Sequence, residues 1–232
     1  MNKKISIILS TYNEAAIIKK TINEIFTTLD DVEIVVVDDN SIDGTSEIIS
    51  SIQNQNLKIF SRKSRGLASA FLLGMINTSG SYIGWTDSNM PQLTYHFRAM
   101  LEKLETYDIV LLSRYVEGGG DQRSKMRILS SKIINFLCRN ILDNEIKDYT
   151  SSIFLMKREK LNVAIPICYG HGEFWIEFLF KLKKNGTKIV EIPYTHSPDH
   201  EGMSKTATNI IRFFNLGFDY IFRILITRIR KN

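Results

Sequence analysis

Short apolar runs rich in β-branched residues alternate along this chain with longer segments of helical periodicity. The runs with the length of buried strands are residues 5–9, 33–37, 57–60, 82–85, 109–113, 153–156 and 188–192. The segments of helical period lie at about residues 14–28, 43–53, 67–77, 92–105, 125–141 and 173–184. Strands and helices that alternate in this way are typical of a sheet covered by helices. The pattern therefore predicts an α/β fold with a mostly parallel sheet.

The length and composition of the chain limit the number of domains. The chain has 232 residues, of which 44% are hydrophobic and 24% charged, and this suits one well-covered core. We expect one domain over residues 1–205 and a helical extension over residues 206–232. The apolar run near the start is too short for a signal peptide and is interpreted as the first strand. Cys138 and Cys168 lack metal-type spacing and indicate a reduced, cytoplasmic compartment.

The C-terminal segment, residues 206–229, is apolar but contains Arg212, Asp219 and Arg223. Each charge at the centre of a bilayer would cost about 2.5–3.5 kcal/mol, so we do not expect this segment to cross a membrane. Apolar side chains beside basic ones suit an amphipathic helix that lies in the membrane interface. The alternative is a terminal helix packed on the core of the domain.

The net charge of +5 is concentrated toward the C-terminus of the chain. A basic surface of this kind favours an anionic partner, although a mild excess is also common as a solubility feature. We expect the partner to be the cytoplasmic face of a membrane, where the protein would be peripheral, and we expect no nucleic acid.

Polar residues follow three of the expected strands directly. These clusters are Ser10–Glu14, Asp38–Thr45 and Thr86–Asn89. Open parallel sheets bind ligands outside the carboxyl ends of their strands, where loops and helix N-termini meet. Acidic groups gathered at one rim repel one another, so a bound cation or a hydroxyl-rich ligand is the simplest explanation for them.

Some residues of these clusters are explained by local structure alone, and others are not. Asp43 is expected to cap a helix and Gly44 to satisfy a turn, because both types are preferred at such positions. Asp39 and Asp87 follow strand ends without an evident capping role. For these two residues we expect ligand binding.

An ordered series of motifs makes the interpretation more specific. The series comprises S-T-Y-N-E, V-V-V-D-D-N-S-I-D-G-T, R-G-L-A-S-A, W-T-D-S-N, S-R-Y-V-E-G-G-G, D-Y-T-S-S, E-F-W-I-E, V-E-I-P and G-M-S-K. It resembles family 2 glycosyltransferases, and its later part is similar to the polyprenol-phosphate (dolichol-phosphate) mannosyltransferase branch. The likeness covers about residues 4–205. It implies a GT-A fold, a Rossmann-like mostly parallel sheet, extended here by the amphipathic C-terminal helix.

The resemblance also implies a role for individual residues. The base and ribose of a nucleotide would contact Thr11, Tyr12, Glu14 and Asp39. Arg65, just before Gly66 at a helix start, would lie near the nucleotide, where a guanidinium and free amides suit phosphate. The donor diphosphate or the acceptor phosphate would contact Arg114, Ser204 and Lys205. The alternatives are a salt bridge for Arg114 and ordinary surface charge for Lys205.

A divalent metal, Mg²⁺ or Mn²⁺, is the cofactor that the resemblance implies. Asp87 matches the first position of the D-x-D motif of the family, and Asn89 occupies the second position. The amide of Asn89 can bind a hard cation through its oxygen but brings no charge, so Gln92 or a water would complete the site. The metal would neutralise the charge that grows on the departing diphosphate.

The implied reaction is an inverting transfer of a sugar from a nucleotide-diphosphate donor, GDP-mannose-like or a UDP-sugar, to a polyprenol-phosphate-type acceptor. An anionic phosphate needs no strong general base. The branch usually has an arginine shortly before G-x-S-K, where this chain has Asp199 and His200. Protonated His200, or Arg123 or Arg127 from the glycine-rich loop, would then replace its charge. His196 and His200 are interpreted as plain loop histidines.

Two other functions remain open at this stage. The acceptor would be a hydroxyl of a glycan or lipid-linked saccharide if Glu173, Glu177 or Asp199 acted as the general base. The third hypothesis is a non-catalytic nucleotide-binding module, because the metal motif is incomplete. A sugar-nucleotide pyrophosphorylase is excluded, because Ser10–Glu14 has no glycine-rich loop with Arg and Lys.

Overall fold

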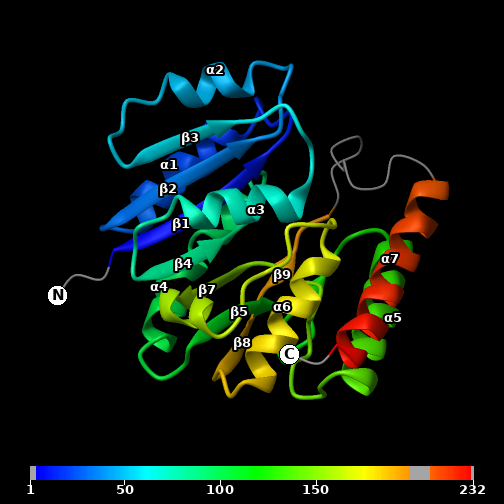
Figure 1. The fold of residues 1–232 in the computed structure, drawn as a ribbon. Coiled ribbons are helices and arrows are strands. Elements are labelled where there is room, and N and C mark those ends of the chain that lie inside the picture. The colour runs from blue at the N-terminus through cyan, green and yellow to red at the C-terminus, as the bar shows by residue number, and fades with distance from the viewer. Residues whose placement is uncertain (1–3, 199–209, 231–232) are drawn as a thin grey trace.

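The computed structural model describes residues 4–198 and 210–230, which form a sheet covered by helices on both faces (Figure 1). Seven strands form the sheet in the order β3-β2-β1-β4-β7-β5-β8. They are β1 (Ile5–Thr11), β2 (Val32–Asp38), β3 (Leu57–Ser61), β4 (Tyr82–Trp85), β5 (Ile109–Ser113), β7 (Phe154–Lys157) and β8 (Ile189–Pro193). All neighbours are parallel except β7, which is antiparallel to both β4 and β5. The predicted mostly parallel sheet is confirmed.

The helices are α1 (Ile18–Thr28), α2 (Thr45–Ser50), α3 (Leu67–Ile76), α4 (His96–Lys103), α5 (Lys125–Ile141), α6 (Glu173–Lys184) and α7 (Ile210–Ile229). Both α5 and α6 have the predicted bounds. The helix expected from residue 92 begins instead as a 3₁₀ turn, Pro91–Leu93, before α4. A proline suits this first turn because it has no amide hydrogen to donate.

Two short strands were not predicted. Strand β6 (Gly120–Asp121) pairs in parallel with β9 (Thr195–His196), outside the main sheet. Two-residue strands are too short to show a period of two, so the glycine-rich segment looked like a plain loop in the sequence. The pair fixes the segment after β8 beside the segment after β5.

The alternation of side chains along β1 divides the core in two. Ile8 packs with Phe71 of α3 and Trp175 of α6 on one face of the sheet. Ile7 and Leu9 pack on the opposite face, with the apolar residues of α1 and α4. Successive side chains of a strand point to opposite faces, so a run that is apolar at every position can be buried on both sides.

Helix α7 packs against α5 and α6 (Figure 1). Ile224 is fully buried, and Glu177 of α6 accepts hydrogen bonds from Arg223 and Arg230, both at 2.9 Å. The prediction that this helix packs on the core of the domain is confirmed for its inner face. Within the described part of the chain, no helix is both long enough and apolar enough to span a bilayer. The predicted domain boundary at residue 205 falls outside the described residues.

Candidate active site

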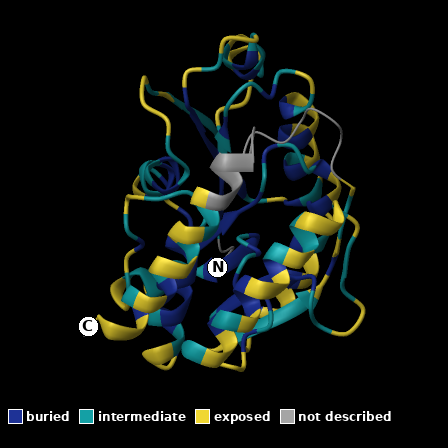
Figure 2. Cartoon of the chain, turned by 90° about the vertical axis from the view of Figure 1, so that its right-hand side faces the viewer, coloured by how far each residue is buried: buried dark blue, intermediate teal, exposed yellow. Residues whose placement is uncertain are grey.

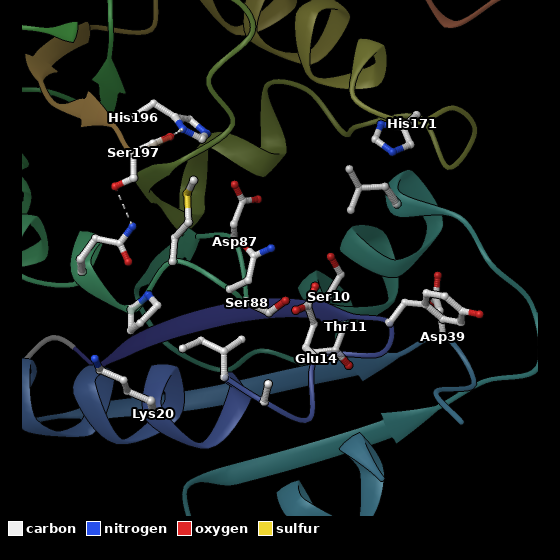
Figure 3. Close-up of a pocket in the computed structure, with 18 of the residues that line it drawn as sticks. Ser10, Thr11, Glu14, Lys20, Asp39, Asp87, Ser88, His171, His196 and Ser197 are labelled. Atoms are coloured by element: carbon white, nitrogen blue, oxygen red, sulfur yellow. Dashed lines mark hydrogen bonds between the residues drawn. The ribbon is translucent and has the colours of Figure 1, made fainter. Parts of the chain in front are cut away.

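A cavity of about 830 Å³ opens at the carboxyl ends of β1 and β4 (Figure 3). The residues that line it include Ser10, Thr11, Tyr12, Glu14, Lys20, Asp39, Arg65, Gly66, Asp87, Ser88, Asn89, Gln92, Arg127, Gly170, His171, His196 and Ser197. In Figure 3, Asp39 and His171 lie toward one end of the cavity, His196 and Ser197 toward the other, and Asp87 between them. The parallel register of β1 with β2 and β4 brings these loops to one edge.

The segment after β1 is held by the loop that follows β2. Thr11 lies opposite Asp38 in the parallel register, and its Oγ1 donates to Asp38 Oδ1 at 2.8 Å. Asp38 is buried and also accepts hydrogen bonds from Ser41 and Ser46. Of the two adjacent aspartates, Asp38 therefore supports the loop, and only Asp39 lines the cavity.

The turn before α2 confirms the turn role of Gly44, but the N-cap of the helix is Gly44 itself, and Asp43 lies one residue before it. Gly44 has a φ of +92°, a conformation that favours glycine. The Asp43 carboxylate accepts from the backbone N–H of Thr45 at 3.1 Å, in the first turn of the helix. It also accepts from the backbone N–H of Ala15 at 3.0 Å, which ties this turn to the segment after β1. Glu14, nearly buried, donates its N–H to Thr45 Oγ1 at 2.8 Å.

Asp39 is bound by the segment that leads into α3. Its Oδ2 accepts from Arg62 Nη2 at 3.0 Å and from the backbone N–H of Gly66 at 2.9 Å. Arg62 also donates from Nη1 to Ser69 Oγ at 2.8 Å. The carboxylate thus shapes the loop over residues 62–66, and its predicted contact with base or ribose stays a prediction. Sequence reasoning missed Arg62, although its position directly after β3 was a signal.

Tyr12 and Arg65 are predicted site residues that the fold brings together. The guanidinium carbon of Arg65 lies 3.4 Å from the centre of the Tyr12 ring. A guanidinium over the face of an aromatic ring is attracted by the negative potential of that face. Both residues line the cavity, and Arg65 directly precedes Gly66, whose backbone N–H donates to Asp39.

Asp87 is the second residue after β4 and points into the cavity (Figure 3). The loop is anchored from α1, because Thr21 Oγ1 donates to the carbonyl oxygen of Ser88 at 2.7 Å. Burial raises the pKa of Asp87, and the charges of Arg114 and Arg123, together with the protonated form of His196, oppose this rise. A carboxylate that is desolvated in this way is stabilised when a cation binds beside it.

The neighbours of Asp87 in the lining supply neutral oxygen ligands. Both Asn89 and Gln92 line the cavity, and Gln92 Nε2 donates to Ser197 Oγ at 3.3 Å. No cluster of three or more His, Cys, Asp or Glu side chains with metal-binding geometry occurs among the described residues. A divalent cation held here would therefore use Asp87 with the amide oxygens of Asn89 and Gln92. Such a hard donor set fits Mg²⁺ or Mn²⁺.

His196 is not the plain loop histidine that the sequence suggested. It lies in β9 and lines the cavity. Its Nδ1 is 2.8 Å from the carbonyl oxygen of Ser197, and a carbonyl can only accept, so Nδ1 carries the hydrogen. Burial lowers the pKa of His196, which favours the neutral ring with a lone pair on Nε2. This side chain is also a candidate metal ligand. His200 lies outside the described residues.

Arg114 is buried behind the cavity and does not line it. Its Nε and Nη2 donate to the two oxygens of Asp148 at 2.8 and 2.7 Å, and Nη2 also donates to Thr150. Burial acts to raise the pKa of Asp148, but Arg114 outweighs this effect and the pKa is lowered. The salt-bridge alternative for Arg114 is confirmed, and a phosphate contact stays a prediction. Sequence reasoning missed this role of Asp148, because the pair depends on the tertiary structure.

The two arginines expected to reach in from the glycine-rich segment behave differently. Arg127, in the first turn of α5, lines the cavity. Arg123 instead donates to Asp121 from Nε at 2.9 Å and from Nη2 at 2.6 Å. Of the two, only Arg127 lines the cavity, whereas Arg123 pairs with Asp121 and acts on Asp87 through its charge. The contact of either arginine with an acceptor phosphate stays a prediction.

The candidate general bases are also engaged elsewhere or not described. Glu177 is buried and bound by Lys181 of α6 and by two arginines of α7, so the interpretation of this residue as a base is wrong. Glu173 is buried and accepts from the backbone N–H of His171 at 2.9 Å. Asp199, Ser204 and Lys205 lie outside the described residues.

Comparison with known proteins gives a consistent result. The chain matches the model of the family described as glycosyl transferase family 2 over residues 6–163. A dolichol-phosphate mannosyltransferase of Pyrococcus furiosus is 32% identical over 219 residues, which cover 87% of this chain and 59% of that protein. The chain thus spans less than two thirds of this relative. A polyprenol monophosphomannose synthase of Mycolicibacterium smegmatis is 27% identical over 218 residues, covering 89% of this chain and 82% of that protein.

Solved structures show the same fold. Glucosyl-3-phosphoglycerate synthase from Mycobacterium tuberculosis, in complex with UDP, superposes with a TM-score of 0.75 at 18% identity. The match covers 100% of this chain and 82% of that chain. The complex of that protein with Mn²⁺, UDP and phosphoglyceric acid gives a TM-score of 0.74 at 19% identity, covering 100% and 80% of the two chains. The predicted GT-A fold is confirmed.

Proposed function

The chain belongs to glycosyl transferase family 2, and from this premise we propose that it transfers a sugar from a nucleotide-diphosphate sugar to a polyprenol-phosphate-type lipid. The observation that carries the proposal is the position of Asp87. Its half-buried carboxylate lies in the cavity between one end with Asp39, Tyr12 and Arg65 and another end with His196. The two relatives that suggest the acceptor are named dolichol-phosphate mannosyltransferase and polyprenol monophosphomannose synthase.

The nucleotide of the donor occupies the end of the cavity with Tyr12 and Arg65 in this proposal. The nearby loop is already ordered by Asp39, which binds Arg62 and the N–H of Gly66. The Arg65 guanidinium supplies a positive charge, and the N-terminus of α3 begins just after Gly66. A positive charge beside a helix N-terminus favours the diphosphate.

Asp87, with Asn89 and Gln92, would hold a divalent cation, Mg²⁺ or Mn²⁺. When bound, such a cation supplies Lewis-acid stabilisation of the diphosphate leaving group. His196 has its Nδ1 hydrogen directed at a carbonyl, so its Nε2 can contribute to the same site. Because the side chain of Asn89 is neutral, Asp87 is the only acidic ligand among these side chains.

The acceptor phosphate contacts Arg127 in this proposal. Arg127 lines the cavity from the first turn of α5, and Arg123 is paired with Asp121. A phosphate oxygen is already anionic, so it can attack the anomeric carbon without transferring a proton to a base. This agrees with Glu177 being bound by three cations of α6 and α7 rather than facing the cavity.

A lipid acceptor requires a surface that can meet the membrane. The outward faces of α5 and α7 carry exposed apolar side chains, which we call the α5–α7 surface (Figure 2). They are Met126, Leu129, Ile133, Phe136, Phe218, Ile221, Phe222, Leu225 and Ile229. Exposed basic residues of the same helices include Lys132, Arg139 and Arg228. Apolar and basic groups together favour the interface of an anionic membrane, where the protein would be peripheral on the cytoplasmic side.

A second function is a transfer to a hydroxyl of a glycan or a lipid-linked saccharide. Asp199 in place of the arginine that the branch usually carries is the observation that favours it. A hydroxyl must lose its proton, and a carboxylate near the acceptor would receive it. A non-catalytic nucleotide-binding module is a third possibility and becomes one outcome of the experiment below.

A two-way screen tests the proposal. GDP- and UDP-sugars are combined with Mn²⁺ or Mg²⁺ and with either a phosphorylated polyprenol or a lipid-linked saccharide, and the sugar-lipid product is measured. We expect product only with the phosphorylated polyprenol and only with metal. Product with the saccharide alone would support the second function. Nucleotide binding without product in any arm would support the binding module.

A further inference from the structure

The inner face of α7 contacts the wall of the cavity through one side chain. A Cβ added to Gly172 would lie 2.2 Å from Tyr220 Oη and 3.4 Å from Tyr220 Cζ. The φ of Gly172 is −106°, so its backbone conformation is open to any residue. Glycine is therefore required here by the Tyr220 hydroxyl, which occupies the space of a side chain.

Gly172 directly precedes α6 and follows two residues that line the cavity, Gly170 and His171. The backbone N–H of His171 donates to Glu173 Oε2 at 2.9 Å, and Glu173 Oε1 lies against Gly170, where a Cβ would meet it at 2.1 Å. The carbonyl oxygen of Gly170 accepts from the backbone N–H of Ala68 at 3.3 Å. This bond joins residues 170–172, which form a wall of the cavity, to the first turn of α3. That turn lies next to Arg65, at the end of the cavity proposed for the nucleotide.

We infer that Tyr220 is a positioning residue, which holds the cavity wall formed by residues 170–172 at the place set by α7. The inference rests on the proposed function, because it assigns the wall to the substrate site of that reaction. Tyr220 does not line the cavity itself, and its contact with the wall is the one at Gly172.

Helix α7 lies between the cavity wall and the α5–α7 surface, so the contact of Tyr220 with Gly172 connects the two. The helix is anchored on its inner side by Arg223 and Arg230, which bind Glu177 of α6. Its outer side belongs to the α5–α7 surface. The helix that rests on lipid in the proposed function is thus also the helix whose tyrosine sets the cavity wall.

A double-mutant cycle tests the contact. Gly172→Ala places a methyl group on the Tyr220 hydroxyl, so the wall or α7 must move. Tyr220→Phe removes the hydroxyl and leaves the methyl group beside ring carbon at an ordinary distance. We expect Gly172→Ala to lower kcat/KM about tenfold, since a small misplacement far from the reacting atoms has effects of this size. We expect the kcat/KM of the double variant to recover to within about threefold of the kcat/KM of Tyr220→Phe alone.

The matched control is Gly217→Ala in α7, where an added Cβ meets no atom within 4 Å. This control is expected to keep the kcat and KM of the wild-type protein, and all five proteins are compared by thermal unfolding. A positioning role predicts a changed KM or kcat in Gly172→Ala that recovers in the double variant, with every protein folded at the assay temperature. Wild-type kinetics in Gly172→Ala, or losses that simply add in the double variant, would overturn the inference.

A binding measurement separates this inference from the proposed function. The affinity of GDP or UDP with Mn²⁺ is measured by calorimetry across the same cycle, because the Gly170–Ala68 bond connects the wall to the nucleotide end. We expect weaker binding in Gly172→Ala and recovery in the double variant. If the wild-type protein binds nucleotide but transfers no sugar, the proposed function fails while the binding cycle still decides the role of Tyr220. Equal affinities throughout the cycle, in a wild-type protein that does transfer sugar, would reject that role alone.

Discussion

The guanidinium carbon of Arg65 lies 3.4 Å from the centre of the Tyr12 ring, which joins the segment after β1 to the segment before α3. We expect Arg65→Lys to weaken nucleoside diphosphate binding about fivefold, because lysine keeps the charge but loses the planar stack. Arg65→Ala should weaken it further. The measurement is calorimetric titration with GDP and UDP. Lys63→Ala, an exposed cation two residues away and outside the lining, is the control and should bind normally.

The pair of Asp39 and Arg62 separates two roles for the aspartate. If Asp39 acts by ordering the loop, Asp39→Asn and Arg62→Ala should both weaken nucleotide binding, each by about tenfold, because a charge-assisted pair is lost in either variant. If Asp39 acts only by contacting ribose, Arg62→Ala should leave the affinity unchanged. Titration of both variants with the same nucleotide distinguishes the two roles, and an unaffected Arg62→Ala would contradict the loop-ordering role.

Strand and helix positions were predictable here because burial on both faces leaves a strong local signal. The run from Ile5 to Leu9 is apolar except for Ser6, and it forms most of β1 with side chains in both cores. The direction of β7 was not predictable, since an isolated apolar run carries no information about parallel or antiparallel pairing. The pairing of β6 with β9 is equally a tertiary property of two segments far apart in the chain.

The sequence predicts which loops form the site. It predicts less well which side chains of those loops are available to bind a ligand. Tyr12, Arg65 and Asp87 line the cavity as expected from strand ends and motifs. Arg114 matches a motif equally well, yet it forms a salt bridge with Asp148, which lies far along the chain. Tertiary partners decide whether a charged side chain is available to a ligand, and a single sequence does not reveal them.

Buried Glu33 gives the fold a dependence on pH that is separate from catalysis. Its carboxylate accepts from Ser6 at 2.6 Å and from Ser79, and pairs with Lys58 at 2.9 Å. Burial acts to raise the pKa of Glu33, but these hydrogen bonds outweigh it and lower the pKa from 4.5 to about 2. The folded pKa is below the unfolded one, so the carboxylate stabilises the fold above about pH 4.5 and this stability is lost as pH falls toward 2.

The corresponding test compares Glu33→Gln with the wild-type protein by urea unfolding. A shift of this size corresponds to ~3 kcal/mol of unfolding free energy at neutral pH. We expect Glu33→Gln to be less stable than the wild type near neutral pH, and the difference to shrink as the pH is lowered through 4 toward 3. Glu24→Gln, on an exposed face of α1, should show no such gap. A difference that stays constant over this range would contradict the assignment.

The α5–α7 surface makes membrane binding testable without any acceptor. We expect Phe222→Ser combined with Leu225→Ser to weaken binding to vesicles of phosphatidylglycerol and phosphatidylcholine by at least tenfold, since each apolar side chain contributes about 1.5–3 kcal/mol when buried. The fraction of protein that sediments with the vesicles measures this binding. Ile76→Ser on α3 removes an exposed apolar residue outside this surface and is the control. Equal sedimentation of all variants would show that lipid binds elsewhere or not at all.

The central claim is that Asp87 holds a divalent cation beside the donor diphosphate, and Mn²⁺ binding measured by electron paramagnetic resonance in the presence of GDP or UDP tests it most directly. We expect the wild-type protein, and Glu117→Gln as an exposed acidic control, to bind Mn²⁺ with the same affinity. Asp87→Ala should lose this binding and all metal-dependent turnover while keeping its fold by circular dichroism, because Asp87 is the only acidic side chain of the proposed donor set. An Asp87→Ala variant that binds Mn²⁺ normally and transfers sugar at the wild-type rate would contradict the account.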